Sequence, residues 1–141
     1  MQKSAYIATG VVLLLKYQNI FKALSDEIRL RLLRLLAVTE VSVCVCELVD
    51  TINVPQYQVS RQLSILKKAG LVDNEKKGRW AYYYALKDQS EFHRALFNIV
   101  KNHVNEPTFM KDEKKLKSRL AIRDGDTCVV GHCGGKHGPA P

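Results

Sequence analysis

The chain has little of what marks secreted, membrane-spanning or multidomain proteins. Its 141 residues allow one core and an extension, but not two cores. The four cysteines form two close pairs instead of a spread disulfide framework, which indicates reduced thiols. The apolar run Tyr6–Leu15 is too short to span a bilayer, which takes about 20 residues, and no small-residue cleavage site follows it. We therefore expect a cytoplasmic protein without a membrane partner.

Acidic residues are also scarce relative to basic ones. Lysine and arginine number 22 against 14 aspartates and glutamates, for a formal net charge of +8. This balance favours a polyanionic partner, either nucleic acid or an anionic membrane surface, and does not choose between them.

The sequence lacks the marks of a thiol enzyme. It contains no C-x-x-C, no βαβ pattern surrounds Cys44 and Cys46, and no base or oxyanion residues converge in sequence. We expect no enzymatic activity, and a small thiol oxidoreductase remains the less favoured alternative.

Hydrophobic periodicity predicts two helices in the first third of the chain. Residues 5–23 are apolar almost all round, so this helix must be covered by the core or by a second subunit. Ser25, followed by two acidic residues, is expected to cap the next helix. Its apolar stripe is Ile28, Leu32, Leu35 and Leu36, with Arg31 and Arg34 on the opposite face.

A helix-turn-helix pattern follows. Residues 41–46 alternate with period two, which predicts a short extended piece before a helix over 47–52. Asn53-Val54-Pro55 breaks the chain. A second helix then has Val59, Leu63 and Leu66 on one face and Gly70 as its C-cap.

A β-hairpin with a basic tip comes next, over residues 71–86, and then a last helix. Asp88 and Glu91 have the spacing of a capping box at the start of the last helix, and Pro107 is expected to mark the end of that helix. The last helix has an apolar stripe of Phe92, Leu96, Ile99, Val100 and Val104. The sequence therefore predicts a mainly α fold with a β-hairpin wing (α+β), a winged helix-turn-helix. We expect residues 1–107 to form the DNA-binding and dimerisation domain and residues 108–141 a charged segment with a flexible Cys/His/Gly-rich tail.

The predicted fold places a set of polar side chains against DNA. The second helix of a helix-turn-helix lies in the major groove with its N-terminal residues facing the bases. Gln pairs with adenine and Arg with guanine, and basic residues at the wing tip contact phosphates or the minor groove. The expected DNA-binding residues are Gln56, Gln58, Ser60, Arg61, Gln62, Lys76, Lys77 and Arg79.

Five segments together resemble the ArsR/SmtB family of metal-responsive repressors. They match the family's opening signature, the Cys-Val-Cys motif of its arsenic-responsive members, the recognition helix and its exit, and the wing. In order these are Phe21–Leu30, Cys44–Leu48, Val59–Leu63, Lys68–Val72 and Gly78–Tyr83. The resemblance implies a homodimer, joined through its first and last helices, that represses transcription by binding double-stranded operator DNA until metal binds.

The cysteines depart from the family pattern. Arsenic-responsive relatives often carry a third cysteine three residues after the pair, where this chain has Val49, and its N-terminus lacks the cysteines of cadmium and lead sensors. Trivalent arsenic or antimony takes about three sulfurs, so another ligand must complete a site at Cys44 and Cys46. Cys128 or Cys133, from the same or the partner subunit, is the expected donor.

The spacing of Cys44 and Cys46 sets a geometric problem. In a regular helix they point apart, and in a strand they lie about 6.6 Å apart along the chain. We therefore expect ion binding to bend the backbone at the start of the supporting helix, and thiols near that helix N-terminus to have lowered pKa values. The alternative is that both are small buried hydrophobic residues.

The histidines offer weaker candidates. Zinc-responsive relatives use a paired acid–His set on the last helix, and Glu91, His93, His103 and Glu106 resemble it with a spacing one residue short. A structural role for these histidines is favoured. A zinc site built from the tail alone matches no common zinc module.

The sequence thus predicts a repressor released from DNA when As(III) or Sb(III) binds cysteine thiolates. Sensing of another soft ion (cadmium, lead or copper) or of thiol redox state on the same fold is the alternative.

Overall fold

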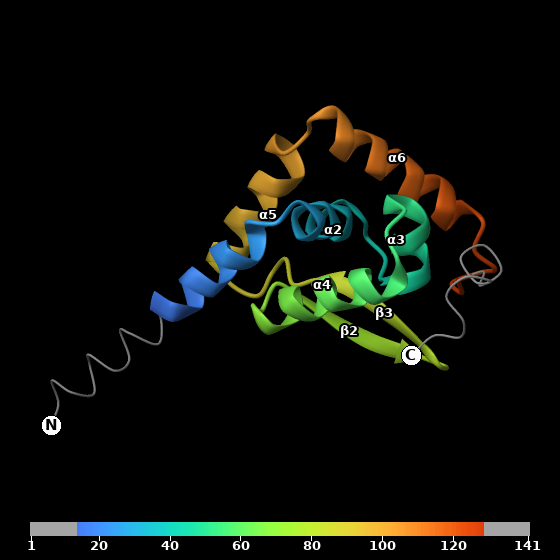
Figure 1. Ribbon diagram of the computed structural model, residues 1–141, viewed down its shortest axis with the longest axis horizontal. Coiled ribbons are helices and arrows are strands. Elements are labelled where there is room, and N and C mark those ends of the chain that lie inside the picture. The colour runs from blue at the N-terminus through green and yellow to red at the C-terminus, as the bar shows by residue number, and fades with distance from the viewer. Residues whose placement is uncertain (1–13, 129–141) are drawn as a thin grey trace, which may run out of the picture.

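The computed structural model describes residues 14–128 of the chain (Figure 1). Residues 14–24 are helical, and the predicted start of this helix, residues 5–13, lies outside the described residues. The elements that follow are α2 (Glu27–Val38), β1 (Val43–Cys44), α3 (Val45–Ile52), α4 (Gln56–Lys68), β2 (Val72–Lys77), β3 (Trp80–Ala85), α5 (Glu91–His103) and α6 (Pro107–Ala121). This order is a helix-turn-helix followed by a hairpin wing, as predicted.

The N-cap of α2 is Asp26 and not Ser25. The Asp26 carboxylate accepts a hydrogen bond of 3.1 Å from the backbone N–H of Arg29, while the Ser25 hydroxyl donates to the carbonyl of Lys22. Both are good capping residues by type, so the sequence pattern alone could not separate adjacent candidates.

The helix-turn-helix consists of α3 and α4. Asn53 ends α3 in a left-handed conformation, with φ of 55°, as its residue type predicted. Val59, Leu63 and Leu66 on α4 are completely buried, which confirms the predicted core face. The extended piece is shorter than expected, because β1 covers only Val43–Cys44 and α3 already begins at Val45.

The wing forms part of a three-stranded antiparallel sheet with strand order β1-β3-β2. Gly78, with φ of 67°, lies in the tight turn between β2 and β3, where its backbone conformation is one that other residues rarely adopt. The short β1 pairs with β3 in a register that sets Cys44 opposite Tyr82. The wing is therefore joined directly to the strand that carries the first cysteine.

Helix α5 begins two residues later than the predicted capping box implied. Its N-cap is Ser90, which accepts from the backbone N–H of His93, so the expected pair of Asp88 and Glu91 was wrong. Phe97 and Val100 are buried, whereas Ile99 remains 53% exposed. The exposed part of the apolar stripe is available for contact with another surface.

Residues beyond Pro107 form helix α6, which packs against α2 and α3 (Figure 1). The arginines expected on the outer face of α2 are covered by it, because Arg31 forms an ion pair with Asp112 at 2.8 Å and Arg34 one with Glu113 at 2.9 Å. Pro107 begins this helix at a position where its missing N–H costs nothing. That residues 1–107 form a separate domain stays a prediction.

The main core lies between α2, α3, α4 and the sheet, with Phe97 and Val100 of α5 and Leu116 of α6 completing it. A second, smaller cluster consists of Trp80, Tyr82 and three cysteines. Among residues 14–128, no helix is both long and apolar enough to cross a membrane.

Candidate thiol cluster and DNA-reading surface

Three cysteine sulfurs gather at the point where β1 becomes α3. The Sγ atoms of Cys44, Cys46 and Cys128 all lie within 4.8 Å of one another, and all three side chains are buried. They are thiols, not disulfides. We call this set the thiol cluster. Cys133, the other predicted donor, lies outside the described residues.

The change from strand to helix solves the spacing problem of Cys44 and Cys46. Cys44 is the N-cap of α3 and keeps extended backbone angles, φ −70° and ψ 146°, while Cys46 already lies in the first helical turn. A residue pair that straddles such a junction follows neither helix nor strand geometry. The junction therefore brings both sulfurs close together without an ion, which neither regular geometry allows, and a distortion of this helix start on ion binding stays a prediction.

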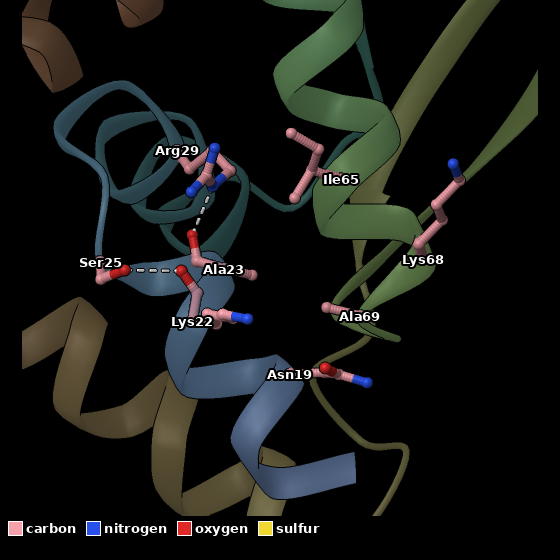
Figure 2. A pocket seen from close by; sticks show the side chains of 8 residues that line it. All are labelled: Asn19, Lys22, Ala23, Ser25, Arg29, Ile65, Lys68 and Ala69. Carbon is pink, nitrogen blue, oxygen red and sulfur yellow. Dashed lines mark hydrogen bonds between the residues drawn. The ribbon is translucent and has the colours of Figure 1, made fainter. Parts of the chain in front are cut away.

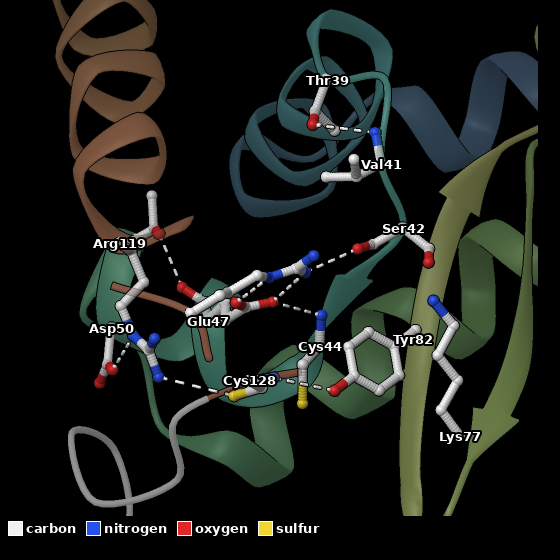
Figure 3. Close-up of polar contacts among 12 residues, drawn as sticks. Thr39, Val41, Ser42, Cys44, Glu47, Asp50, Lys77, Tyr82, Arg119 and Cys128 are labelled. Carbon is white, nitrogen blue, oxygen red and sulfur yellow. Dashed lines mark hydrogen bonds and ion pairs between the residues drawn. The ribbon is translucent and has the colours of Figure 1, made fainter. Parts of the chain in front are cut away.

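Cys128 reaches the cluster from the segment that follows α6, residues 122–128, which we call the C-terminal arm. The backbone N–H of Cys128 donates a hydrogen bond of 3.1 Å to the Tyr82 hydroxyl. Arg119, on the last turn of α6, donates to the Cys128 sulfur at 3.6 Å (Figure 3). Cys128, at the end of the arm, therefore contacts both β3 and α6.

Two arginines of α6 and the arm hold this segment against α3. Arg123 donates hydrogen bonds of 2.7 and 2.6 Å to the two carboxylate oxygens of Glu47, and one of 2.7 Å to the carbonyl of Ser42. Arg119 pairs with Asp50 at 2.7 Å. Glu47 also accepts the backbone N–H of Cys44 at 2.9 Å, so the same carboxylate caps α3 and anchors the arm.

Sequence reasoning missed these supporting residues. Glu47 lies three residues after Cys44, which is the spacing of a capping box, and Arg119 and Arg123 are four apart, a spacing typical of one side of a helix, although α6 ends at Ala121. Those spacings were visible. The long-range pairing between the two segments was not, because it depends on where α6 packs.

The thiols of the cluster differ in acidity. Hydrogen bonds from Cys44 and Cys46, together with the charge of Arg119, lower the pKa of Cys128 well below that of an ordinary thiol. The bond to Cys128 and burial raise the pKa of Cys44. The expectation of a lowered pKa at the α3 N-terminus was wrong for Cys44, because its neighbour Cys128 takes the negative charge.

This donor set suits a soft ion. Thiolates select soft metals and metalloids, and three of them meet here in a buried setting with charged groups close by. An ion bonded to sulfur at about 2.3 Å, the length of a zinc–thiolate bond, spans two sulfurs at most about 4.6 Å apart. The 4.8 Å within which the three sulfurs lie is therefore close to the span that such an ion requires.

The predicted DNA-binding residues lie on α4 and at the wing tip. Arg61, Lys76, Lys77 and Arg79 are exposed, and Gln56, Gln58 and Ser60 are half-buried. Gln62 differs, because its side-chain oxygen accepts a hydrogen bond of 2.6 Å from Arg29 on α2 and the residue is 9% exposed. Gln62 thus faces α2 in this structure.

Tyr57 is an additional candidate that the sequence reading passed over. It lies in the first turn of α4 between two predicted base-reading glutamines and is 74% exposed. A large aromatic side chain so open to solvent at the start of a recognition helix is suited to contact with DNA.

His93, at the start of α5, has a structural role. His93 is buried, and its ring nitrogens lie 2.8 Å from the Ser90 hydroxyl and 2.9 Å from the carbonyl of Gly70. It therefore ties the start of α5 to the turn after α4. Within residues 14–128, the thiol cluster is the set of Cys, His, Asp and Glu side chains close enough to hold an ion.

A cavity of about 510 Å³ lies between residues 19–29 and the end of α4 (Figure 2). Its polar lining comes from Asn19, Lys22, Ser25, Arg29 and Lys68. Figure 2 shows Ser25 and Arg29 hydrogen-bonded to backbone carbonyls, of Lys22 and Ala23. This lining offers neither a carboxylate nor a histidine to act as a general base for Ser25.

Comparison with known proteins agrees with the fold. Residues 26–74 match the model of a family described as bacterial regulatory protein, arsR family. An uncharacterized HTH-type transcriptional regulator of Methanocaldococcus jannaschii is 46% identical over 74 residues, which cover 52% of this chain and 82% of that protein.

Two further relatives differ in the ion that their names indicate. The arsenical resistance operon repressor of Bacillus subtilis is 42% identical over 50% of this chain and 67% of its own length. The cadmium resistance transcriptional regulatory protein CadC of Listeria innocua is also 42% identical, over 45% of this chain and 53% of its own.

Among solved structures, reduced HlyU from Vibrio cholerae superposes with a TM-score of 0.52 at 23% identity, over 71% of this chain and 94% of that chain. This likeness confirms the winged helix-turn-helix fold. The chain belongs to the arsR family, and it is a DNA-binding transcriptional regulator and not an enzyme.

Proposed function

We propose that this protein is a repressor that leaves its operator when a trivalent metalloid ion, As(III) or Sb(III), binds Cys44, Cys46 and Cys128. The observation that carries the proposal is the thiol cluster, in which three sulfurs lie within 4.8 Å of one another. A cluster of three matches the number of sulfurs that such an ion takes. Cys128 supplies the donor that Val49 cannot.

The charges around the cluster favour a trivalent ion. Arg119 is paired with Asp50 and Arg123 with Glu47, so the neighbouring charges cancel. Three thiolates around a trivalent ion also sum to zero, whereas a divalent ion leaves one negative charge and a monovalent ion two. A net charge at a buried site costs free energy, so the neutral complex is favoured.

The cluster is placed to act on DNA binding. Cys44 and Cys46 lie at the start of α3, which packs directly against the recognition helix α4. In a helix-turn-helix the first helix supports the second and crosses the DNA backbone. A shift at the start of α3 therefore changes the position of the residues that read the bases.

Exposed apolar side chains support the proposed homodimer. Tyr17 and Phe21 of the first helix are 40% and 57% exposed and pack edge-on against Phe92 of α5, with ring centroids 4.9 and 6.1 Å apart. Leu14, Leu15 and Ile99 add to the same two helices. We propose that the partner subunit covers this surface, which lets the dimer read two half-sites.

The test is release from DNA by a panel of ions. An operator is first selected from random duplexes with the purified protein. The complex is then titrated with arsenite, antimonite, cadmium, lead, zinc and copper(I), and separately with a thiol oxidant. Release by arsenite or antimonite at lower concentration than by the divalent ions supports the proposal. Release by cadmium or lead alone would assign the cluster to divalent ions, and release by oxidant alone would assign it to redox sensing.

A further inference from the structure

One aromatic residue connects the thiol cluster to the wing. Tyr82 is 1% exposed and lies in β3, the central strand of the sheet. Its strand register sets it opposite Cys44, and its hydroxyl accepts the backbone N–H of Cys128 at 3.1 Å. Two of the three cysteines, 84 residues apart in sequence, therefore contact the same residue, Cys44 through strand pairing and Cys128 through the Tyr82 hydroxyl (Figure 3).

The same ring supports a charged residue of the wing. The Lys77 ammonium lies over the Tyr82 ring, 5.0 Å from its centroid, and the Arg123 guanidinium lies 5.7 Å from that centroid. Cation–π contacts of this length fix the direction of a long, flexible side chain. Lys77 is among the wing residues expected to contact DNA phosphates, so its direction affects DNA affinity.

We propose that Tyr82 transmits occupation of the thiol cluster to the wing, by moving with Cys128 and Cys44 and redirecting Lys77. The inference rests on the proposed function. The three sulfurs lie within 4.8 Å of one another without an ion, and bonds of about 2.3 Å to one ion would set their separations anew, at no more than about 4.6 Å. A change that side-chain rotation does not absorb moves the backbone of Cys44 or Cys128, and Tyr82 contacts both, through strand pairing and through its hydroxyl.

This route is separate from the one through α3. The α3 route moves the recognition helix and alters base contacts, whereas the Tyr82 route moves a phosphate contact at the wing. The two predict different behaviour in salt, since loss of a phosphate contact lowers the slope of log K against log salt by about 0.9. Ion binding in the normal protein should therefore reduce that slope.

The test uses Tyr82→Phe, which keeps the ring and removes only the hydroxyl that accepts from Cys128. Tyr83→Phe is the matched control, because Tyr83 is on the same strand but pairs with Val43 and points away from the cluster. Operator affinity is measured by anisotropy with and without saturating arsenite. Arsenite binding is followed separately by the emission of Trp80, the only tryptophan, which lies in the same small core cluster.

We expect Tyr82→Phe to bind operator within about twofold of the normal protein in the absence of arsenite, and the ratio of operator Kd values with and without arsenite to fall about tenfold, a coupling loss of ordinary allosteric size. Tyr83→Phe should keep the full ratio. An unchanged ratio in Tyr82→Phe, with Trp80 reporting bound arsenite, would overturn the inference and leave the proposed function standing. If the normal protein itself shows no arsenite-dependent release, the proposed function fails first.

A second variant makes the test independent of how Tyr82→Phe folds. Lys77→Gln removes the ammonium over the ring, so the salt slope of the free protein should already equal that of the arsenite-bound normal protein. Arsenite should then cause no further change of slope. A slope that still falls on arsenite binding would place the released phosphate contact elsewhere and contradict the role of Tyr82.

Discussion

The guanidinium of Arg123 donates hydrogen bonds of 2.6 and 2.7 Å to the two oxygens of the Glu47 carboxylate, and Glu47 is fully buried. The two residues are 76 positions apart in sequence, so this pair fastens the C-terminal arm to the start of α3. Glu47 in turn accepts the N–H of Cys44. The position of one cysteine of the cluster thus depends on the segment that carries another.

Removing one partner of this pair should destabilise the protein strongly. Arg123→Met leaves a buried carboxylate without its counter-charge, a change that typically costs about 3 kcal/mol or more. We expect a loss of that size in the free energy of unfolding by urea. The exposed Arg94→Met on α5 is the control and should change it by less than about 0.5 kcal/mol.

The double variant separates charge burial from simple packing. Arg123→Met with Glu47→Met removes both charges and should recover part of the lost stability, because no unpaired charge stays buried. If the double variant loses the sum of the two single losses, the pair is not coupled and the arm is held by other contacts.

The acidity of Cys128 predicts a dependence of stability on pH. Its folded-state pKa lies below that of an unfolded thiol, about 8.5, so folding releases a proton. The stabilisation is complete above the unfolded pKa and is lost as pH falls toward the folded one. The difference in unfolding free energy between the normal protein and Cys128→Ser should therefore grow from about pH 5 to about pH 8. A difference that is flat or shrinks over this range would show that Cys128 is protonated in the folded state.

The DNA surface makes a prediction that separates neighbouring residues. Arg61→Ala should weaken operator binding by about 1–3 kcal/mol and relax preference at one base position. Gln62→Ala should have a smaller effect on DNA affinity, because its oxygen is occupied by Arg29. Footprinting and competition against single-base operator variants measure both. Arg94→Ala, with the same charge change on the exposed face of α5, controls for general electrostatics. Equal effects at Arg61 and Gln62 would mean that Gln62 leaves Arg29 when DNA binds.

Elements with strong local signals could be predicted from the sequence. Features that depend on contact between distant segments could not. The apolar faces of α2 and α4, the Asn53 break and the Gly78 hairpin follow from local periodicity and turn chemistry, and the structure confirms them. Helix caps missed by one or two residues, because Ser25 and Asp26, or Asp88 and Ser90, are equally good capping types.

The thiol cluster could likewise be predicted only in part. The Cys44–Cys46 pair was visible, and elimination pointed to a tail cysteine, but no local pattern indicated that Arg119 and Arg123 would seat Cys128. Their partners, Asp50 and Glu47, are on α3, some 70 residues away. The geometry of Cys44 and Cys46 was not predicted, because a regular strand and a regular helix were considered separately. The pair lies across the junction of β1 and α3.

The first pair of cysteines can be tested without disturbing the arm. Cys44→Ser and Cys46→Ser should each bind operator normally, since both side chains are buried away from the predicted reading face. Both should lose release by arsenite, because two remaining sulfurs do not complete the site. Retained release in Cys46→Ser at normal arsenite concentration would exclude it as a ligand.

The comparison of Cys128→Ser with Cys133→Ser tests whether Cys128 is the third ligand of the ion. Both variants remove one thiol from the C-terminal part of the chain; Cys128 lies in the thiol cluster, and Cys133 lies outside the described residues. Arsenite is titrated into the operator complex of each protein, with release followed by anisotropy and bound arsenite counted after removal of the excess. We expect Cys133→Ser to release DNA like the normal protein, with one arsenite bound per subunit, and Cys128→Ser to stay on DNA at arsenite concentrations at least tenfold higher. Normal release by Cys128→Ser would contradict this expectation.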